Sequence, residues 1–199
     1  VYNKLLQLKG EMTSIRIEKL KNFNKLNLKD SAIVELEKIR SMEPTNISTL
    51  HLLSNYYLEL NRTDEAHNVI KNALQINSNN PKSRIILADV YLTQAKWDSA
   101  KTTLVKLIID PAVSNQTKEE VTHFIYSKYK SNTSNSAIRQ TADHLFKKLI
   151  QSTTKSGKAY ALAADFFLDT DQTQYAINAL EQATELNPSN DSFWQRRLQ

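Results

Sequence analysis

The chain has four histidines, the side chains best suited to metal binding and to proton transfer near neutral pH. They are His51, His67, His123 and His144. A helical zinc site needs two histidines at helical spacing with a nearby carboxylate, and no such run occurs. The chain has no cysteine, which excludes thiolate metal sites, cysteine nucleophiles and disulfides. The sequence therefore predicts no metal site and no cofactor.

Other catalytic patterns are also missing. A phosphate-binding loop needs clustered glycines, whereas the two glycines, Gly10 and Gly157, stand alone. No serine lies between glycines as in a hydrolase elbow. The adjacent carboxylates Glu119 and Glu120 cannot face each other on a helix, so they do not form an acid–base pair. We expect a protein that is not an enzyme.

Basic and aromatic residues raise the question of nucleic-acid binding. Residues 111–156 contain seven Lys and Arg against three Asp and Glu, and the chain has eight tyrosines. The alternative is that these lysines and arginines cover solvated helix faces. The repeat described below explains Tyr57, Tyr91 and Tyr160 as packing residues, which leaves Tyr126 and Tyr129 unassigned. This favours a protein or peptide partner over a nucleic acid.

The composition predicts a helical globular protein. It is 40% hydrophobic and 24% charged with a net charge of +5, and two glycines and four prolines are too few for an all-β chain. The longest apolar stretches, such as 159–168, are about half the length of a membrane-spanning helix. The abundance of Asn, Lys and Ile and the missing cysteine favour a bacterial periplasmic or envelope-associated protein, with a cytoplasmic one as the alternative.

The sequence repeats with a period of 34 residues. Ala32, Ala66 and Ala100 follow one another at this interval, and a further copy centres on Ala176. Apolar residues recur four and seven positions after each alanine, which is one face of a helix. Upstream lies a second apolar stretch in which a large residue, a small one and an aromatic recur, as in Leu53, Ser54 and Tyr57. The pattern therefore predicts that each repeat forms two helices that pack closely against each other.

Turn residues separate the predicted helices. Pro44, Pro111 and Pro188 end the second helix of three repeats, because proline cannot continue a helix. Asn27, Asn61 and Asp171 stand where the first helix closes, and these residue types tolerate the left-handed conformation that such a position needs. Asn80 and Pro81 suit a helix cap and first turn.

This pattern resembles the tetratricopeptide repeat. The resemblance implies an all-α fold, a right-handed α-α superhelix (solenoid) of antiparallel helix hairpins with about five repeats. The predicted divisions are residues 1–12 as the end of a preceding helix or an extension, 13–46, 47–80 and 81–114 as repeats, 115–156 as an irregular stretched repeat, 157–190 as a repeat, and 191–199 as a capping helix or the start of a sixth repeat. Both ends would fit a piece of a longer array, with Trp194 at the start of that sixth repeat.

Residues 115–156 are eight longer than one repeat. A capping-box spacing from Thr117 to Glu120 predicts a helix that runs to about Tyr129. A polar linker at 131–136 follows, and Ala142, Phe146 and Leu149 then supply the buried face of the second helix. The extra residues either lengthen these helices or lie in the turn between them.

The resemblance implies binding by the first helices, which line the concave side of such a superhelix. The residues on that face are His51, Leu52, Asn55, Leu58, Lys82, Ile85, Ile86, Asp89, Leu92, Lys158, Leu162 and Asp165. Leu52, Ile85 and Leu162 belong to an apolar stripe that suits an extended or helical peptide. The alternative is that about half of these apolar residues pack against the neighbouring hairpin.

Some tetratricopeptide proteins bind a terminal carboxylate with Lys, Arg and Asn. Asn55 matches one such place, but His51 and Ile86 stand where that site needs polar or basic residues, so this activity is not carried over. The function expected is a scaffold or adaptor that binds a peptide or protein. The alternative is a structural module of a larger protein or envelope assembly.

Overall fold

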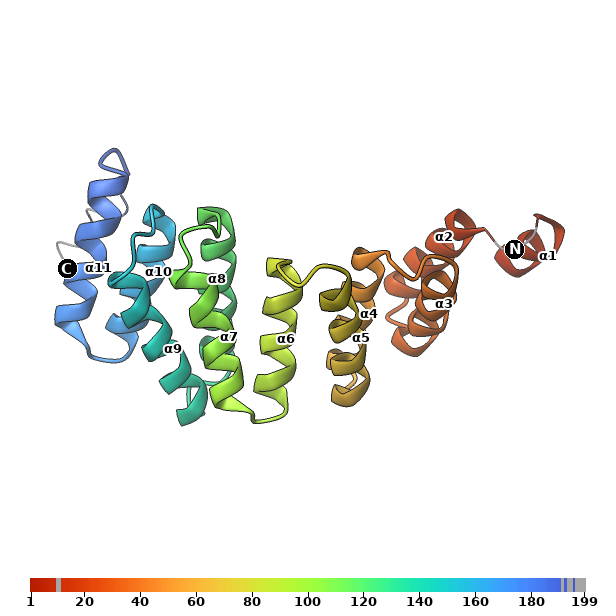
Figure 1. The fold of residues 1–199 in the computed structure, drawn as a ribbon, viewed down its shortest axis with the longest axis horizontal. Coiled ribbons are helices and arrows are strands. Elements are labelled where there is room, and N and C mark those ends of the chain that lie inside the picture. Colours follow the sequence, from red (N-terminus) through yellow and green to blue (C-terminus); the bar gives the residue numbers. More distant parts are fainter. Residues whose placement is uncertain (10–11, 191, 193–194, 196–199) are drawn as a thin grey trace. The chain divides into compact units, whose positions relative to one another are not determined.

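The computed structural model describes residues 1–9, 12–190, 192 and 195, and every regular element in these residues is an α-helix (Figure 1). Trp194, predicted to begin a further repeat or a cap, and Gly10 lie outside the described residues. The chain divides into two compact units, Val1–Gln94 and Ala95–Gln199, which are described separately. The boundary falls within the predicted repeat 81–114.

Six helices form unit 1 and five form unit 2 in the described residues. Unit 1 contains α1 (Tyr2–Lys9), α2 (Thr13–Lys25), α3 (Lys29–Met42), α4 (Ile47–Glu59), α5 (Thr63–Ile76) and α6 (Pro81–Thr93). Unit 2 contains α7 (Trp97–Ile109), α8 (Asn115–Ser131), α9 (Ser136–Ile150), α10 (Gly157–Asp169) and α11 (Thr173–Leu186). The predicted all-α solenoid class is confirmed.

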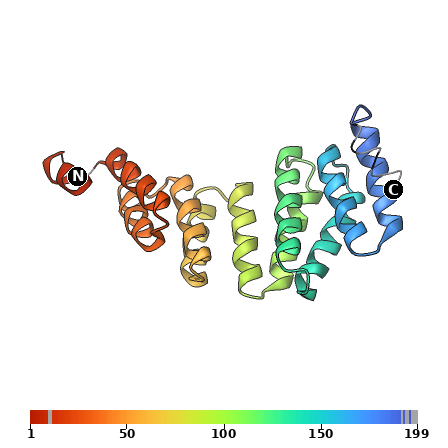
Figure 2. The ribbon, with the colours of Figure 1, turned by 180° about the vertical axis from the view of Figure 1, so that it is seen from behind.

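Each unit is built from antiparallel hairpins, as the ribbon shows from both sides (Figures 1 and 2). In unit 1, α2 packs against α3, α4 packs against α5, and α6 packs against α4 and α5. In unit 2, α8 pairs with α9 and α10 with α11. We call α2, α4, α6, α8 and α10 the first helices, and α3, α5, α7, α9 and α11 the second helices. In unit 2, α8 contacts α10, and α9 contacts both α7 and α11, so that unit has a first-helix layer and a second-helix layer.

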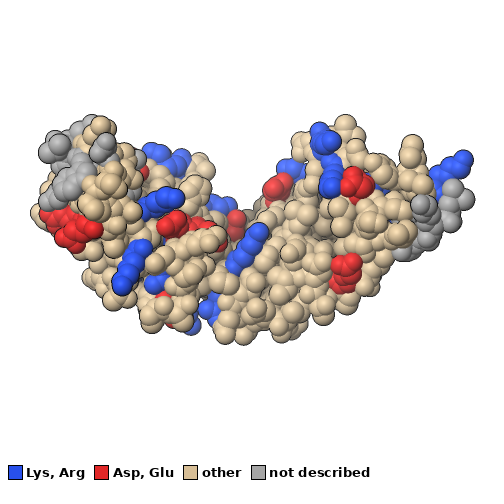
Figure 3. All heavy atoms as spheres, turned by 90° about the horizontal axis from the view of Figure 1, so that it is seen from above, with Lys and Arg blue, Asp and Glu red and all other residues tan. Residues whose placement is uncertain are grey.

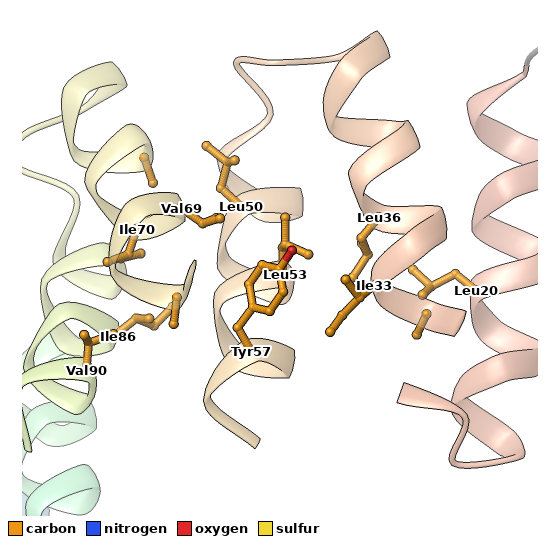
Figure 4. Close-up of a cluster of buried hydrophobic side chains, with 13 residues drawn as sticks. Leu20, Ile33, Leu36, Leu50, Leu53, Tyr57, Val69, Ile70, Ile86 and Val90 are labelled. Atoms are coloured by element: carbon orange, nitrogen blue, oxygen red, sulfur yellow. The ribbon is translucent and has the colours of Figure 1, made fainter. Parts of the chain in front are cut away.

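The alanines that mark the period lie at the closest packing points. Ala32, Ala66, Ala100 and Ala142 are completely buried, and Ala176 nearly so. A methyl group at this place lets two helix backbones approach, because interiors are packed to crystal-like density. Figure 4 shows the result in unit 1, where side chains of α2 to α6 form one continuous core.

The helices end where the sequence predicts. Helices α3, α7 and α11 each end two residues before a proline: Pro44, Pro111 and Pro188. Asn27, Asn61 and Asp171 adopt positive φ angles of 54°, 57° and 58°. Ala95 takes the same conformation at 55°, although alanine has no side-chain group that favours it.

The irregular repeat differs from the sequence prediction at its start. Helix α8 begins at Asn115 with Ser114 as its cap, since the Ser114 Oγ accepts a hydrogen bond from the Thr117 backbone at 3.2 Å. The predicted capping box from Thr117 to Glu120 is therefore wrong, and the carboxylate of Glu120 accepts a hydrogen bond from the Gln116 side chain at 3.4 Å. Most of the extra residues lengthen the helices, to 17 residues in α8 and 15 in α9, against 13 or 14 in the other hairpins, and the rest lie in the turn 132–135 and the connection 151–156.

Candidate functional site

In unit 1 the first helices α2 and α4 border a small depression of about 260 Å³. Leu52 and Asn55 of α4 line it together with Phe23 of α2, and the exposed fraction of Leu52 is 36%. The Tyr56 hydroxyl of α4 donates a hydrogen bond to the Asn24 side chain of α2, and both residues line the depression. A lining that combines a few apolar side chains with amide groups suits a peptide, because amides bind the backbone and leucine contacts an apolar side chain.

In unit 2 the first helices α8 and α10 border a larger depression of about 670 Å³. Phe124 of α8 and Leu162 of α10 supply its apolar surface, and Lys128 and Lys158 lie beside them. The Lys128 Nζ atom lies 5.6 Å from the centre of the Phe124 ring, within the range of a cation–π contact. The side chain of His123 also lines the depression and is exposed.

Polar contacts hold α8 in place against α10. The Tyr126 hydroxyl and the Lys130 Nζ both contact the Asp169 Oδ2, at 3.1 and 3.0 Å. Burial and the charge of Asp169 raise the pKa of Tyr126, so its hydroxyl stays protonated and donates. Tyr129 packs edge-on against Phe166 with ring centres 4.9 Å apart. Both tyrosines that the repeat left unassigned therefore serve the packing of unit 2.

The structure separates the predicted groove residues into open and buried ones. Leu52 and Asn55 line the depression of unit 1, and Lys158 and Leu162 line that of unit 2. The others line neither depression: Lys82 is exposed, whereas Leu58, Ile85, Asp89 and Asp165 are half-buried, and Leu58 packs against the core of unit 1.

Three predicted groove residues are buried instead, which corrects the sequence interpretation. The exposed fractions of His51, Ile86 and Leu92 are only 7%, 6% and 6%. The His51 ring joins α4 to α6 through a hydrogen bond of 2.7 Å between Nε2 and the Ser83 Oγ, and Ile86 belongs to the core of unit 1. His51 and Ile86 therefore pack between helices of unit 1, and little surface of any of the three side chains is left for a ligand.

Sequence reasoning missed the contribution of α8. Residues 115–156 do not follow the 34-residue period, so no groove residue was predicted there, although His123, Phe124 and Lys128 line the depression. A usable signal was present, because Phe124 and Lys128 are four residues apart and face the same side of a helix. Phe23 and Tyr56, which line the depression of unit 1, were not predicted either.

The described residues provide no cluster suited to metal chemistry. No three His, Asp or Glu side chains among them lie together in a way that could hold a metal ion. His67 packs edge-on against Tyr91, with ring centres 5.7 Å apart. Within the described part of the chain, no helix has the length and apolar character required to span a membrane. On the face shown in Figure 3, basic and acidic side chains lie interspersed among other residues.

Two family models match the chain. Residues 157–190 match the model described as tetratricopeptide repeat, and residues 25–107 match the model described as anaphase-promoting complex, cyclosome, subunit 3. The chain is a tetratricopeptide repeat protein. The predicted family is confirmed, and proteins of this family are in general interaction scaffolds and not enzymes.

Solved tetratricopeptide repeat structures share this fold. A tetratricopeptide repeat protein from Parabacteroides merdae aligns with a TM-score of 0.57 at 13% identity, over 99% of this chain and 74% of its own. The PilF protein of Pseudomonas aeruginosa aligns with a TM-score of 0.53 at 16% identity, over 99% and 86%. YrrB, described as a tetratricopeptide repeat protein with an unusual peptide-binding site, gives 0.50 at 12% identity, over 100% and 98%. Comparison with curated proteins gives no match.

Proposed function

We propose that this tetratricopeptide repeat protein is an adaptor whose first helices bind a peptide segment of a partner protein. The observation that carries the proposal is the depression of unit 2, where Phe124 and Leu162 form an open apolar surface between α8 and α10. Recognition of a peptide by such a surface relies on one or two apolar anchor side chains, with polar groups at the rim that fix its direction.

Unit 1 supports the same proposal with different chemistry. Its depression combines Leu52 with the amides of Asn24 and Asn55, and its rim carries an ion pair between Lys29 and Glu59 at 2.8 Å. Asparagine side chains can pair with both the N–H and the C=O of a peptide backbone. Taken by itself, the depression of unit 1 should therefore bind peptide backbone groups, and the depression of unit 2 should bind an apolar anchor side chain.

The test is a selection of peptides from a random-sequence library on the full chain, followed by affinity measurements with variants. Leu162→Glu should weaken the selected peptides by roughly ten- to a hundredfold, the equivalent of losing the burial of one apolar side chain. Leu52→Glu should weaken the peptides that bind the depression of unit 1. Matched controls are Ile177→Glu on α11 and Val34→Glu on α3, because both residues are exposed on second helices, at 40% and 51%.

The control variants distinguish binding of the peptides by the first helices from nonspecific binding of the peptides to exposed apolar residues. Equal losses in Leu162→Glu and Ile177→Glu would contradict the proposal, provided thermal melting shows that both variants remain folded. A selection that yields no peptide would favour the second predicted role, a structural module within a larger assembly.

A further inference from the structure

A pocket of about 730 Å³ lies in the second-helix layer of unit 2, on different helices from the depression of the first helices. The first turns of α7, the N-terminal half of α9 and Gln172, the cap residue of α11, form its wall. Trp97, Lys101, Arg139 and His144 are among its lining residues. The peptide-binding role proposed above makes no use of this pocket.

The first departure from the repeat pattern at this pocket is a tryptophan. Trp97 is the first residue of α7, whereas the other second helices begin with small or flexible polar residues, Lys29, Thr63, Ser136 and Thr173. A hairpin of this fold therefore does not need a large ring at this place. Trp97 is half-buried and lines the pocket, which leaves part of the indole open to solvent.

The second departure is an extra turn at the start of α9. In α7 the buried Ala100 comes three residues after the helix begins, but in α9 the equivalent Ala142 comes six residues after Ser136. The three extra residues, 136–138, lengthen the start of the helix, and the next residue, Arg139, lies on the wall of the pocket. Arg139 stands three residues before the buried Ala142, as Trp97 stands three before Ala100, so α7 and α9 bring a tryptophan and an arginine to the pocket from corresponding positions.

Among the charged side chains that line the pocket, the guanidinium of Arg139 is available to bind a ligand. The Asp98 carboxylate pairs with Lys101 at 2.7 Å. The Asp143 carboxylate pairs with Lys147 at 2.9 Å and accepts a hydrogen bond from Gln172 at 2.9 Å. Arg139 is exposed, and no ion pair joins its guanidinium to another described residue. An anionic ligand would therefore meet Arg139 without displacing an internal ion pair.

We propose that this pocket binds an acidic segment of a second protein partner, with a carboxylate on Arg139 and an apolar side chain against Trp97. Arginine is suited to this role because its planar guanidinium can donate two parallel hydrogen bonds to one carboxylate. Tryptophan provides a large rigid apolar surface and is common among the residues that dominate protein interfaces. The chain then holds two partners on different helix layers.

The test uses the full chain and a fluorescent peptide of alternating Glu and Leu, with its Gln-for-Glu counterpart as the uncharged probe. Anisotropy at physiological ionic strength should show that the Glu peptide binds more tightly. Arg139→Gln should weaken it about tenfold, the loss expected for a hydrogen-bonded charge pair. Lys106→Gln removes the same charge from an exposed position of α7 outside the pocket and should weaken binding less than about twofold, because salt screens distant charges.

A second measurement locates the bound peptide on the chain. The Glu peptide should shift the indole N–H resonance of Trp97, and Leu162→Glu should leave its affinity unchanged. Equal affinities for the Glu and Gln peptides, or equal losses in the Arg139 and Lys106 variants, would overturn the proposal. Loss of binding in Leu162→Glu but not in Arg139→Gln would place the peptide on the first helices and also overturn it, while leaving the proposed function intact.

Discussion

His51 should make unit 1 sensitive to acid. Its ring lies almost completely buried between α4 and α6, bonded to Ser83, which has no exposed surface. Burial, with a smaller effect from the charge of Lys82, lowers the pKa of His51 from 6.5 to about 4. The folded protein therefore resists protonation of this ring at a pH where the unfolded chain accepts it.

The direction and size of the effect follow from proton linkage. Between pH 6.5 and 4 the unfolded state binds more protons, so the stabilisation present above pH 6.5 is lost as the pH falls. The pKa difference corresponds to about 3 kcal/mol in total, and to about 2 kcal/mol between pH 7.5 and pH 5. His51→Gln keeps a side chain that can hydrogen-bond to Ser83 but cannot titrate, so its stability should fall much less over this interval.

The assay is urea denaturation at pH 7.5 and pH 5, followed by the NMR resonances of α4 and α6 so that unit 1 is observed by itself. Carboxylates also titrate toward low pH, and they are common to both proteins, so the difference between wild type and His51→Gln isolates the histidine. An NMR titration of the ring should give a midpoint near 4. A midpoint near 6.5, or the same loss of stability in both proteins, would refute the reasoning.

Three further substitutions test other parts of the fold. Glu35→Ala removes the carboxylate that pairs with the buried Arg16 at 2.6 Å, and it should lower the free energy of unfolding, measured by urea denaturation, by about 3–5 kcal/mol. The control Glu18→Ala removes an exposed carboxylate and should lower it by less than about 1 kcal/mol. Ala95 has a positive φ angle, which is strained for alanine but not for glycine, so Ala95→Gly should raise the free energy of unfolding by about 0.5–1 kcal/mol. A lower melting temperature would show that the backbone at Ala95 is not strained. Tyr160→Phe deletes a hydroxyl that donates to the backbone carbonyls of Ser152 and Thr154 and should lower the free energy of unfolding by about 1–2 kcal/mol, and an unchanged melt would show that these bonds contribute little.

Much of the fold could be predicted because the repeat constrains it at several levels. The buried alanines, the prolines after α3, α7 and α11, and the left-handed Asn27, Asn61 and Asp171 each depend on the local chain and a period of 34. The start of α8 could not be obtained in this way. Ser114 and Thr117 are both residue types that cap helices, and the helix uses Ser114, whose Oγ accepts the hydrogen bond from the Thr117 backbone. Both signals are local and lie three residues apart, so the sequence alone does not decide between them.

The candidate site was harder to predict because a helix face does not reveal what covers it. His51 and Leu52 are neighbours on α4, yet one is buried against the next hairpin and the other lies at a depression. Which of them is open depends on the packing of α4 against α6 and α2, and helical periodicity does not contain that information. Exposure therefore had to come from the structure.

Departures from the repeat are a better guide to function than the repeat itself. A position that recurs in every hairpin, such as the alanine at Ala66 and Ala100, is explained by packing alone. Phe124, Trp97 and Arg139 have no such explanation, since two come from the stretched repeat and the third replaces a small or flexible polar residue. Each of them lines an open depression or pocket in unit 2. The residues that the hairpins do not require are thus the ones available to recognise partners, which is why the proposed contacts concentrate there.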